Sequence, residues 1–361
     1  MWQINAYRKP RDPDTFTLYH AFVENAASTP TKDFLGYRLC EGENTWADHF
    51  TWISYQEAAT RVSEIGSGLA ALGLSKGQTA GLFSPNCPDW MMSEYGCFRQ
   101  SLAVVPIYAT CGAGTISRIV EHSELRLAFV HVNLVEALLS DLNNSVSSEG
   151  ECPLKIVVVI GKELFRTVPE AVQTESAKQI AEKLHLRIMD LSELRELGRQ
   201  SKAPAVPPQG NDVYSIIYTS GSEGTPKGVI LLHKTTYMAF DEWSGFPGWG
   251  GSLHDWVYYS YLPLAHVFER ELSSLLILNG ASIAYSSSLS QLTEDLEIVK
   301  PTLIIGVPRV WKRIFDKVND TVGKSSFIAR FVFNTAVSSK MAAIKGGYDT
   351  WIDWDKWVLS K

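Results

Sequence analysis

A stretch of twelve residues, 218–229, concentrates side chains suited to binding phosphate. Its glycines, Gly221, Gly224 and Gly228, let the backbone approach a ligand closely and turn N–H groups toward an anion. Four serine and threonine hydroxyls and one lysine add donors and a positive charge. The predicted phosphate-binding residues are Tyr218, Thr219, Ser220, Gly221, Ser222, Glu223, Gly224, Thr225, Pro226, Lys227 and Gly228. Their position directly after an apolar run predicts a polyphosphate site.

This loop differs from two common nucleotide-binding loops. A Walker A loop requires Gly-Lys-Ser/Thr, whereas Lys227 follows Pro226 and precedes Gly228. A dinucleotide-binding loop of the Rossmann type opens with Gly-x-Gly, which is absent from this stretch. A solvated Gly/Ser turn is the alternative for any isolated glycine-rich loop. The density of hydroxyls and the Pro-Lys-Gly ending favour phosphate binding over that turn, and a kinase or a dehydrogenase is disfavoured.

The elements that must position the loop alternate between strand and helix. Apolar runs predict buried strands at residues 79–83, 103–108, 127–132, 155–160, 213–218 and 302–306. A helical pattern follows each of the last four. We therefore expect an α/β fold of mostly parallel sheets flanked by helices.

Three other segments complete the expected organisation. Residues 54–74 open with Ser54 and Glu57 at capping-box spacing and carry an apolar stripe, which predicts a helix. Residues 327–337 are more apolar, and we expect them to form a helix that faces the core rather than a membrane. Prolines and a glycine within residues 201–210 cannot continue a helix or a strand, so the main internal boundary is expected near residues 201–212.

The whole-chain composition disfavours several classes of protein. The chain has 33 Lys and Arg against 39 Asp and Glu, and no block of like charges marks a nucleic-acid-binding arm. Its five widely spaced cysteines include no Cys-x-x-Cys pair, which indicates reduced thiols rather than disulfides or a zinc site. The sequence shows neither a signal peptide nor about 18 consecutive apolar residues. We expect an intracellular protein, cytosolic or peripheral on an organelle membrane such as endoplasmic reticulum or peroxisome.

The glycine-rich loop resembles the phosphate-binding signature of the adenylate-forming (AMP-binding) superfamily, Thr-Ser-Gly-Thr-Thr-Gly-x-Pro-Lys-Gly. A second string, at residues 260–270, resembles Tyr-Leu-Pro-Leu-Ala-His-x-Phe-Glu-Arg of long-chain acyl-CoA synthetases, and so does a third, at residues 301–318. Taken alone, His266 at a helix start is more often a core histidine than a catalytic group. Shorter matches extend the resemblance over nearly the whole chain. It implies that residues 1–361 are a partial N-terminal AMP-binding domain, without the small C-terminal catalytic domain.

The resemblance also implies a reaction. A long-chain fatty acid and ATP would form an acyl-adenylate and pyrophosphate, and coenzyme A would then displace AMP to give acyl-CoA. Lys227 and His266 would be the catalytic residues, and the acyl pocket would lie near His266, Val267, Phe268 and Glu269. Mg²⁺ would be carried by ATP, since the family's ligand glutamate would lie beyond the chain end.

Two features keep other functions open. Glu223 stands where the family has a threonine, and a carboxylate there would repel phosphates. The chain also ends before the family's remaining motifs, so we expect a fragment that alone is inactive. The alternatives are an adenylating ligase for another carboxylic acid and a non-catalytic nucleotide- or acyl-binding fragment. Acyl chain length and oligomeric state stay open.

Overall fold

A computed structural model of the chain describes residues 11–43, 45–145, 152–168, 175–219, 226–244 and 252–346. Its contacts divide the chain into two compact units, Met1–Ile304 and Ile305–Lys361. The predicted internal boundary near residues 201–212 does not coincide with this division, because that segment lies within the first unit. Two side chains of the first unit bind the backbone of this segment. Arg99 Nη2 donates to the Ala203 carbonyl at 3.0 Å, and Ser101 Oγ donates to the Val206 carbonyl at 2.7 Å.

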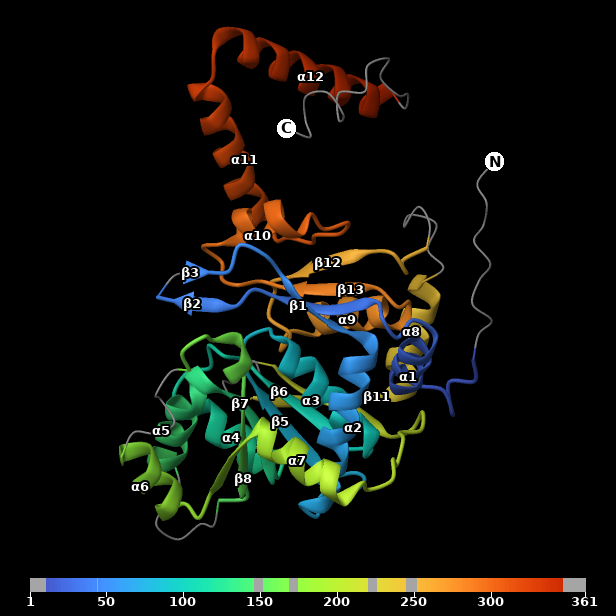
Figure 1. The fold of residues 1–361 in the computed structure, drawn as a ribbon, viewed down its shortest axis with the longest axis vertical. Helices are drawn as coiled ribbons and strands as arrows, with labels where there is room; N and C mark the ends of the chain where they lie inside the picture. Colours follow the sequence, from blue (N-terminus) through green and yellow to red (C-terminus); the bar gives the residue numbers. More distant parts are fainter. Residues whose placement is uncertain are drawn as a thin grey trace. The chain divides into compact units, whose positions relative to one another are not determined.

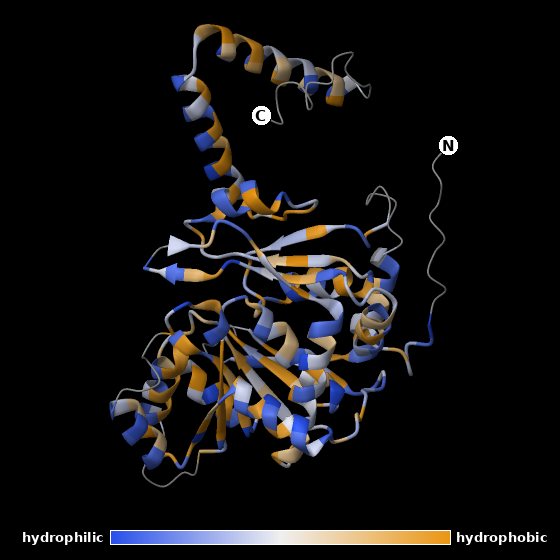
Figure 2. Ribbon diagram, in the orientation of Figure 1, coloured by the Kyte–Doolittle hydropathy of each residue, from blue (hydrophilic) through white to orange (hydrophobic). Residues whose placement is uncertain are grey.

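The larger sheet of the first unit has seven strands in the order β11-β10-β6-β5-β7-β8-β9 (Figure 1). The strands are β5 (Thr79–Phe83), β6 (Ala103–Ile107), β7 (Leu127–His131), β8 (Ile156–Ile160), β9 (Arg187–Asp190), β10 (Val213–Thr219) and β11 (Lys227–Leu232). All neighbours pair in parallel except β10 and β11. The central strands β6, β7 and β8 are mostly apolar (Figure 2) and almost entirely buried, as expected for a parallel sheet covered on both faces.

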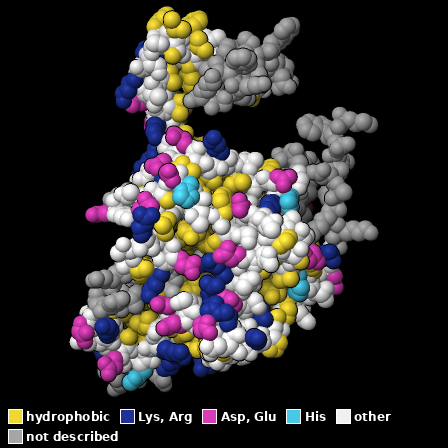
Figure 3. Space-filling model, in the orientation of Figure 1, with side chains coloured by type: hydrophobic (Ala, Val, Ile, Leu, Met, Phe, Trp, Pro, Cys, Tyr) yellow, Lys and Arg dark blue, Asp and Glu magenta, His cyan; other side chains and the backbone are white. Residues whose placement is uncertain are grey.

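Helices cover both faces of this sheet. The helices α2 (Tyr55–Ala71), α3 (Pro88–Arg99) and α7 (Leu191–Ser201) pack together on one face. On the other, α4 (Thr115–His122), α5 (Val135–Ser145) and α6 (Glu175–Lys183) bury a core of aliphatic side chains against the strands. Figure 3 shows acidic and basic side chains interspersed on the outer surface where α2 and α7 lie, consistent with ion pairs such as Arg61–Glu57 and Arg195–Glu64.

The second sheet of this unit has four strands in the order β12-β13-β1-β4. They are β12 (Val257–Ser260), β13 (Ser282–Tyr285), β1 (Asp33–Tyr37) and β4 (Thr51–Ser54), and only β1 and β4 are antiparallel. The helix α9 (Val267–Leu278) packs on β12 and β13 and also contacts α1 (Leu18–Ser28) and α8 (His233–Ser244). Because α3 contacts β1 as well as β5 and β6, it joins the two sheets.

Shorter elements complete the first unit. They are the hairpin β2 (Cys40–Gly42) and β3 (Thr45–Trp46), the helix α10 (Leu292–Val299), and 3₁₀ turns at Val132–Leu134 and Lys162–Leu164. All five cysteines are free thiols, as the sequence predicts.

One helix prediction and one strand prediction require correction. After the predicted strand at residues 213–218 comes not a helix but β11, which pairs antiparallel with β10. Residues 302–306 do not form a strand, and Leu303 makes only an isolated bridge with Tyr258. At this position the Thr302 side chain accepts a hydrogen bond from the Val257 N–H at 2.7 Å, where a regular ladder would offer a backbone carbonyl. The other predicted strands are confirmed, with ends differing by a residue.

The second unit contains α11 (Pro308–Lys324) and α12 (Phe327–Gly346). Both helices match their sequence patterns, but the expectation that residues 327–337 face the core is wrong. Among the residues that the structure describes, Phe327 is 81% exposed and Phe331 is 63% exposed. Among the helices in the described ranges, none combines the length and the apolar character needed to span a membrane.

Close packing of α2 on α7 predicts a sensitive glycine. A Cβ added at Gly198 would lie 1.8 Å from the Glu64 carbonyl oxygen. Because backbone atoms cannot move aside, Gly198→Ala should lower the free energy of unfolding by about 1–3 kcal/mol in urea titrations. Gly323→Ala in α11 is the control, since no atom lies within 4 Å of the added carbon. Equal midpoints for the Gly198 variant and the wild type would contradict close packing.

Burial of His233 predicts a pH dependence of stability. The side chain is buried between the rings of Phe98 and Tyr214, and neither ring nitrogen has a hydrogen-bond partner in the described ranges. Burial lowers the pKa of His233 to about 3. Because an unfolded histidine titrates near pH 6.5, the unfolded state binds the extra proton below that pH, and stability is lost as the pH falls toward 3.

His233→Phe should therefore flatten the pH dependence of the unfolding free energy. Between about pH 6 and 4 the slope of the unfolding free energy against pH should fall by about 1.4 kcal/mol per pH unit, which corresponds to one proton. Urea titrations at several pH values measure it, with the exposed His49→Phe as the control. An unchanged slope would show that His233 is not held neutral by the fold.

Candidate active site

The base of the glycine-rich loop is a β-hairpin at the carboxyl end of β10. Thr219 is opposite Lys227 and Tyr218 is opposite Gly228 in the antiparallel register. Thr219 and Lys227 are both exposed, so a hydroxyl and an ammonium group flank the loop. The predicted residues between them, Ser220, Gly221, Ser222, Glu223, Gly224 and Thr225, lie outside the described residues, while Pro226 and Gly228 are half-buried. A Cβ at Gly228 would lie 2.8 Å from Ile216 Cγ2, which explains this glycine.

Tyr218 anchors the first strand of the hairpin. Its side chain is part of the core, and its hydroxyl lies 2.6 Å from Nδ1 of His122 at the end of α4. The two rings also meet edge to face, with centroids 5.7 Å apart. The Tyr218 side chain is thus directed into the protein, and its contribution to phosphate binding would come through the backbone.

His266 lies immediately before α9 and is exposed. Its Nδ1 accepts a hydrogen bond from the Phe268 N–H at 3.2 Å, so the imidazole caps the helix. With Nδ1 acting as an acceptor, this geometry assigns the proton of the neutral ring to Nε2. His266 can therefore donate a hydrogen bond to a substrate oxygen. Its neighbours Val267 and Phe268 are half-buried and exposed, respectively.

Glu269 has a different environment from these neighbours. Its side chain is buried and accepts hydrogen bonds from Tyr258 Oη and Ser260 Oγ, each at 2.6 Å. Burial raises the pKa of Glu269 to about 7, and the two hydrogen bonds oppose that increase. The carboxyl group therefore joins α9 to β12 inside the protein.

Arg270 connects the same helical turn to the strand that carries the loop. It forms a buried ion pair with Glu94 on α3. Its Nη1 donates to Ser215 Oγ on β10 at 3.0 Å, and its guanidinium lies 5.0 Å from the centre of the Tyr214 ring. Burial raises the pKa of Glu94, and the Arg270 charge opposes this. The helix that begins next to His266 is thus fixed against β10.

Asn86 adds a third connection, which the sequence analysis did not identify. It follows β5 and binds three groups in the turn before His266: Ser260 Oγ at 3.0 Å, the Leu262 carbonyl at 2.6 Å and the Leu264 N–H at 2.8 Å. Because β5, β6 and β10 run parallel, the loops that follow them share one edge of the sheet. Thr219 at the end of β10 and the turn that Asn86 binds therefore both lie at that carboxyl edge. An asparagine three residues after a buried strand was the available signal.

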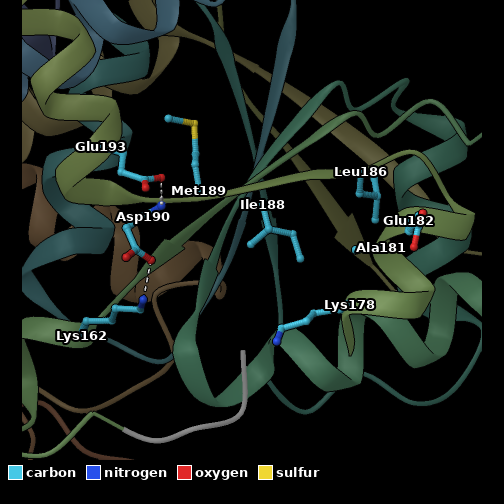
Figure 4. A pocket seen from close by; sticks show the side chains of 9 residues that line it. All are labelled: Lys162, Lys178, Ala181, Glu182, Leu186, Ile188, Met189, Asp190 and Glu193. Carbon is cyan, nitrogen blue, oxygen red and sulfur yellow. Dashed lines mark hydrogen bonds and ion pairs between the residues drawn. The ribbon is translucent and has the colours of Figure 1, made fainter. Parts of the chain in front are cut away.

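A separate concave surface lies beside β9, the outermost strand on the side of the sheet away from β11 (Figure 4). It has a volume of about 490 Å³ and is lined by Lys162, Lys178, Ala181, Glu182, Leu186, Ile188, Met189, Asp190 and Glu193. None of the predicted site residues contributes to it. Lys162 and Asp190 pair with each other across 2.5 Å. We therefore do not assign the predicted chemistry to this surface.

Two curated relatives are similar to the chain over nearly its whole length. Fatty acyl-CoA synthetase A of Dictyostelium discoideum is 37% identical over 97% of the chain and 49% of the relative. The peroxisomal long chain acyl-CoA synthetase 7 of Arabidopsis thaliana is 31% identical over 98% of the chain and 48% of the relative. The chain thus spans about half the length of these relatives.

The fold is also found in solved structures. The A-PCP didomain of carboxylic acid reductase from Segniliparus rugosus, solved in complex with AMP, aligns with a TM-score of 0.72 at 20% sequence identity. The alignment covers 86% of the chain and 46% of that structure. This likeness confirms the predicted α/β fold of adenylate-forming ligases.

The buried ion pair predicts strong coupling between α3 and α9. Arg270→Met should lower the free energy of unfolding by about 3–5 kcal/mol, because Glu94 would stay buried without its partner. Adding Glu94→Leu should recover part of this loss, since no lone charge remains. A double-mutant cycle in urea measures the coupling, with the exposed pair Arg199 and Glu196 as the control. If the two substitutions changed the unfolding free energy additively, the result would contradict an interaction between Arg270 and Glu94.

One family model matches the region that contains all of these contacts. It is described as AMP-binding enzyme, and it matches residues 22–342. The match includes Asn86, both strands of the phosphate-loop hairpin, and α9 with Glu269 and Arg270. The chain therefore belongs to the AMP-binding enzyme family.

Proposed function

We propose that the protein acts in the ATP-dependent activation of a long-chain fatty acid to acyl-CoA. One observation carries the proposal: the hairpin with Thr219 and Lys227 and the turn with His266 are held at the same carboxyl edge of the sheet. Two relatives are named as acyl-CoA synthetases, which supports this substrate class. Because the chain spans about half of their length, the proposal concerns the protein of which this chain forms a part or the whole.

The proposed reaction has two steps. A carboxylate oxygen of the fatty acid attacks the α-phosphorus of ATP, the bond to the bridging oxygen breaks, and pyrophosphate leaves. The thiol of coenzyme A then loses its proton and attacks the acyl carbon, and AMP leaves with the electron pair of the broken C–O bond. Activation is needed because a free carboxylate has no good leaving group.

The chain's own residues would act mainly in the first step. Negative charge grows on phosphate oxygens, and fixed donors stabilise it best where they are already in place. Lys227, the hydroxyls of Thr219, Ser220 and Ser222, and the backbone from Ser220 to Gly224 would supply these donors. The proton on Nε2 of His266 would orient the carboxylate of the fatty acid.

Mg²⁺ is assigned to the nucleotide in this proposal. Within the described ranges, no group of three or more His, Cys, Asp and Glu side chains could hold a metal ion. These residues therefore do not fit a protein-bound metal, and we derive no step through one. ATP would bring the ion to the site.

The proposed location is intracellular, in the cytosol or peripheral on an organelle membrane such as endoplasmic reticulum or peroxisome. The relative from Arabidopsis thaliana is named as peroxisomal, which supports an organelle. Fatty acid, ATP and coenzyme A are the proposed partners. A ligase for another carboxylic acid is the alternative, and a panel of acids distinguishes the two.

Exchange of labelled pyrophosphate into ATP tests the proposal. The complete protein, of which this chain forms a part or the whole, should catalyse exchange that depends on a long-chain fatty acid, with short-chain and aryl acids less active. Lys227→Ala should lower kcat/KM by about 10²–10³, because it removes a charge from the transition state. Lys178→Ala, which replaces an exposed lysine of α6 on the concave surface beside β9, should have no effect. Absence of exchange with every acid, or full activity of Lys227→Ala, would overturn the proposal.

A further inference from the structure

We propose that Asn86 is a positioning residue that sets the location of His266. Its functional consequence rests on the proposed function, whereas its structural consequence does not. Asn86 is half-buried in the connection between β5 and α3, and it lies 180 positions before His266 in the sequence. Its amide group makes the hydrogen bonds to the turn.

The amide of Asn86 is fully used by this turn. Nδ2 donates to the Leu262 carbonyl at 2.6 Å and to Ser260 Oγ at 3.0 Å. Oδ1 accepts from the Leu264 N–H at 2.8 Å. Donors and an acceptor are therefore matched in one orientation, and flipping the amide would break all three bonds.

These contacts control the backbone on which His266 depends. Leu262 and Leu264 lie on the two sides of Pro263, and the Pro263 carbonyl accepts a hydrogen bond from the His266 N–H at 2.8 Å. Fixing both neighbours of Pro263 fixes the direction of that carbonyl. The position of the imidazole, which caps α9 through Nδ1, follows from it.

Ser260 extends the connection into α9. Its hydroxyl accepts from Asn86 and donates to Glu269, which also accepts from Tyr258. The segment from Ser260 to Glu269 is therefore held at both ends, with His266 between them. If Asn86 stabilised only the connection between β5 and α3, replacing it would leave the His266 side chain unchanged. A displaced His266 side chain therefore distinguishes a positioning role from this local one.

Two variants of graded severity test the role. Asn86→Asp keeps an oxygen that can accept from the Leu264 N–H but loses both donated bonds, and Asn86→Ala loses all three. Asn144→Ala, at an exposed position near the end of α5, is the matched control. If Asn86→Ala fails to fold, Asn86→Asp decides the outcome.

The first measurement is the ring NMR signal of His266 in the full chain with labelled histidine. His266→Gln identifies this signal among those of the eight histidines. We expect it to shift or broaden in Asn86→Asp, and more in Asn86→Ala, while the other histidine signals and the Asn144→Ala spectrum stay unchanged. An unmoved His266 signal in a folded Asn86 variant overturns the proposal, whatever the protein's activity.

The second measurement is acid-dependent pyrophosphate exchange by the complete protein. Asn86→Ala should lower its kcat by about 10- to 100-fold through misplacement of His266, with KM for ATP nearly unchanged. Adding Asn86→Ala to His266→Gln should cause little further loss, because the residue it positions is already absent. Wild-type kcat in Asn86→Ala would overturn the role. Absence of exchange in the wild type would refute the proposed function instead, and the His266 signal would then decide the positioning role by itself.

Discussion

The buried ion pair between Arg270 and Glu94 is the contact on which the arrangement of the site depends. The two side chains are only 2% and 3% exposed, so neither charge could remain there without the other. Arg270 also reaches Ser215, whose hydroxyl donates to the Val104 carbonyl on β6. An apolar contact would have a smaller desolvation cost, but it would lack direction. The guanidinium instead fixes α9 against both α3 and β10.

The sequence predicts most of the fold because burial follows regular patterns. The helix after Ser54 and the strands β5 to β8 have the periodicity or the continuous apolar character that their surroundings require. Hydrogen bonding between strands that are separated in the sequence leaves no such pattern. The apolar run of β11 is short enough to fit a helix start or a strand, and only its hydrogen bonds to β10 decide between them. The strand predicted at residues 302–306 does not form, because the Thr302 hydroxyl accepts the hydrogen bond of the Val257 N–H.

The sequence likewise predicts one part of the candidate site and not the other. The composition of the loop at residues 218–229 predicts its chemistry, because glycines, hydroxyls and a lysine have few other uses together. The contacts that hold the segment around His266 against Asn86 and β10 are not visible in the sequence. Asn86 and Leu262 are 176 positions apart, and Arg270 and Glu94 are also 176 apart, so no local pattern can connect them. Glu269 and His266 lie only three positions apart, yet His266 is exposed while the Glu269 side chain is buried, a difference that proximity in the sequence does not show.

The first turn of α9 explains why exposed and buried residues alternate so closely. At about 100° per residue, His266 and Glu269 lie roughly 60° apart around the helix axis, yet one caps the end and the other enters the core. Because Glu269 and Arg270 are hydrogen-bonded on different elements, His266 cannot move relative to β10 without breaking buried bonds. A histidine on a free loop would have to be ordered by the substrate, at about 1–2 kcal/mol per residue. Here folding supplies that order before any ligand binds, which is the condition under which a fixed donor is most effective.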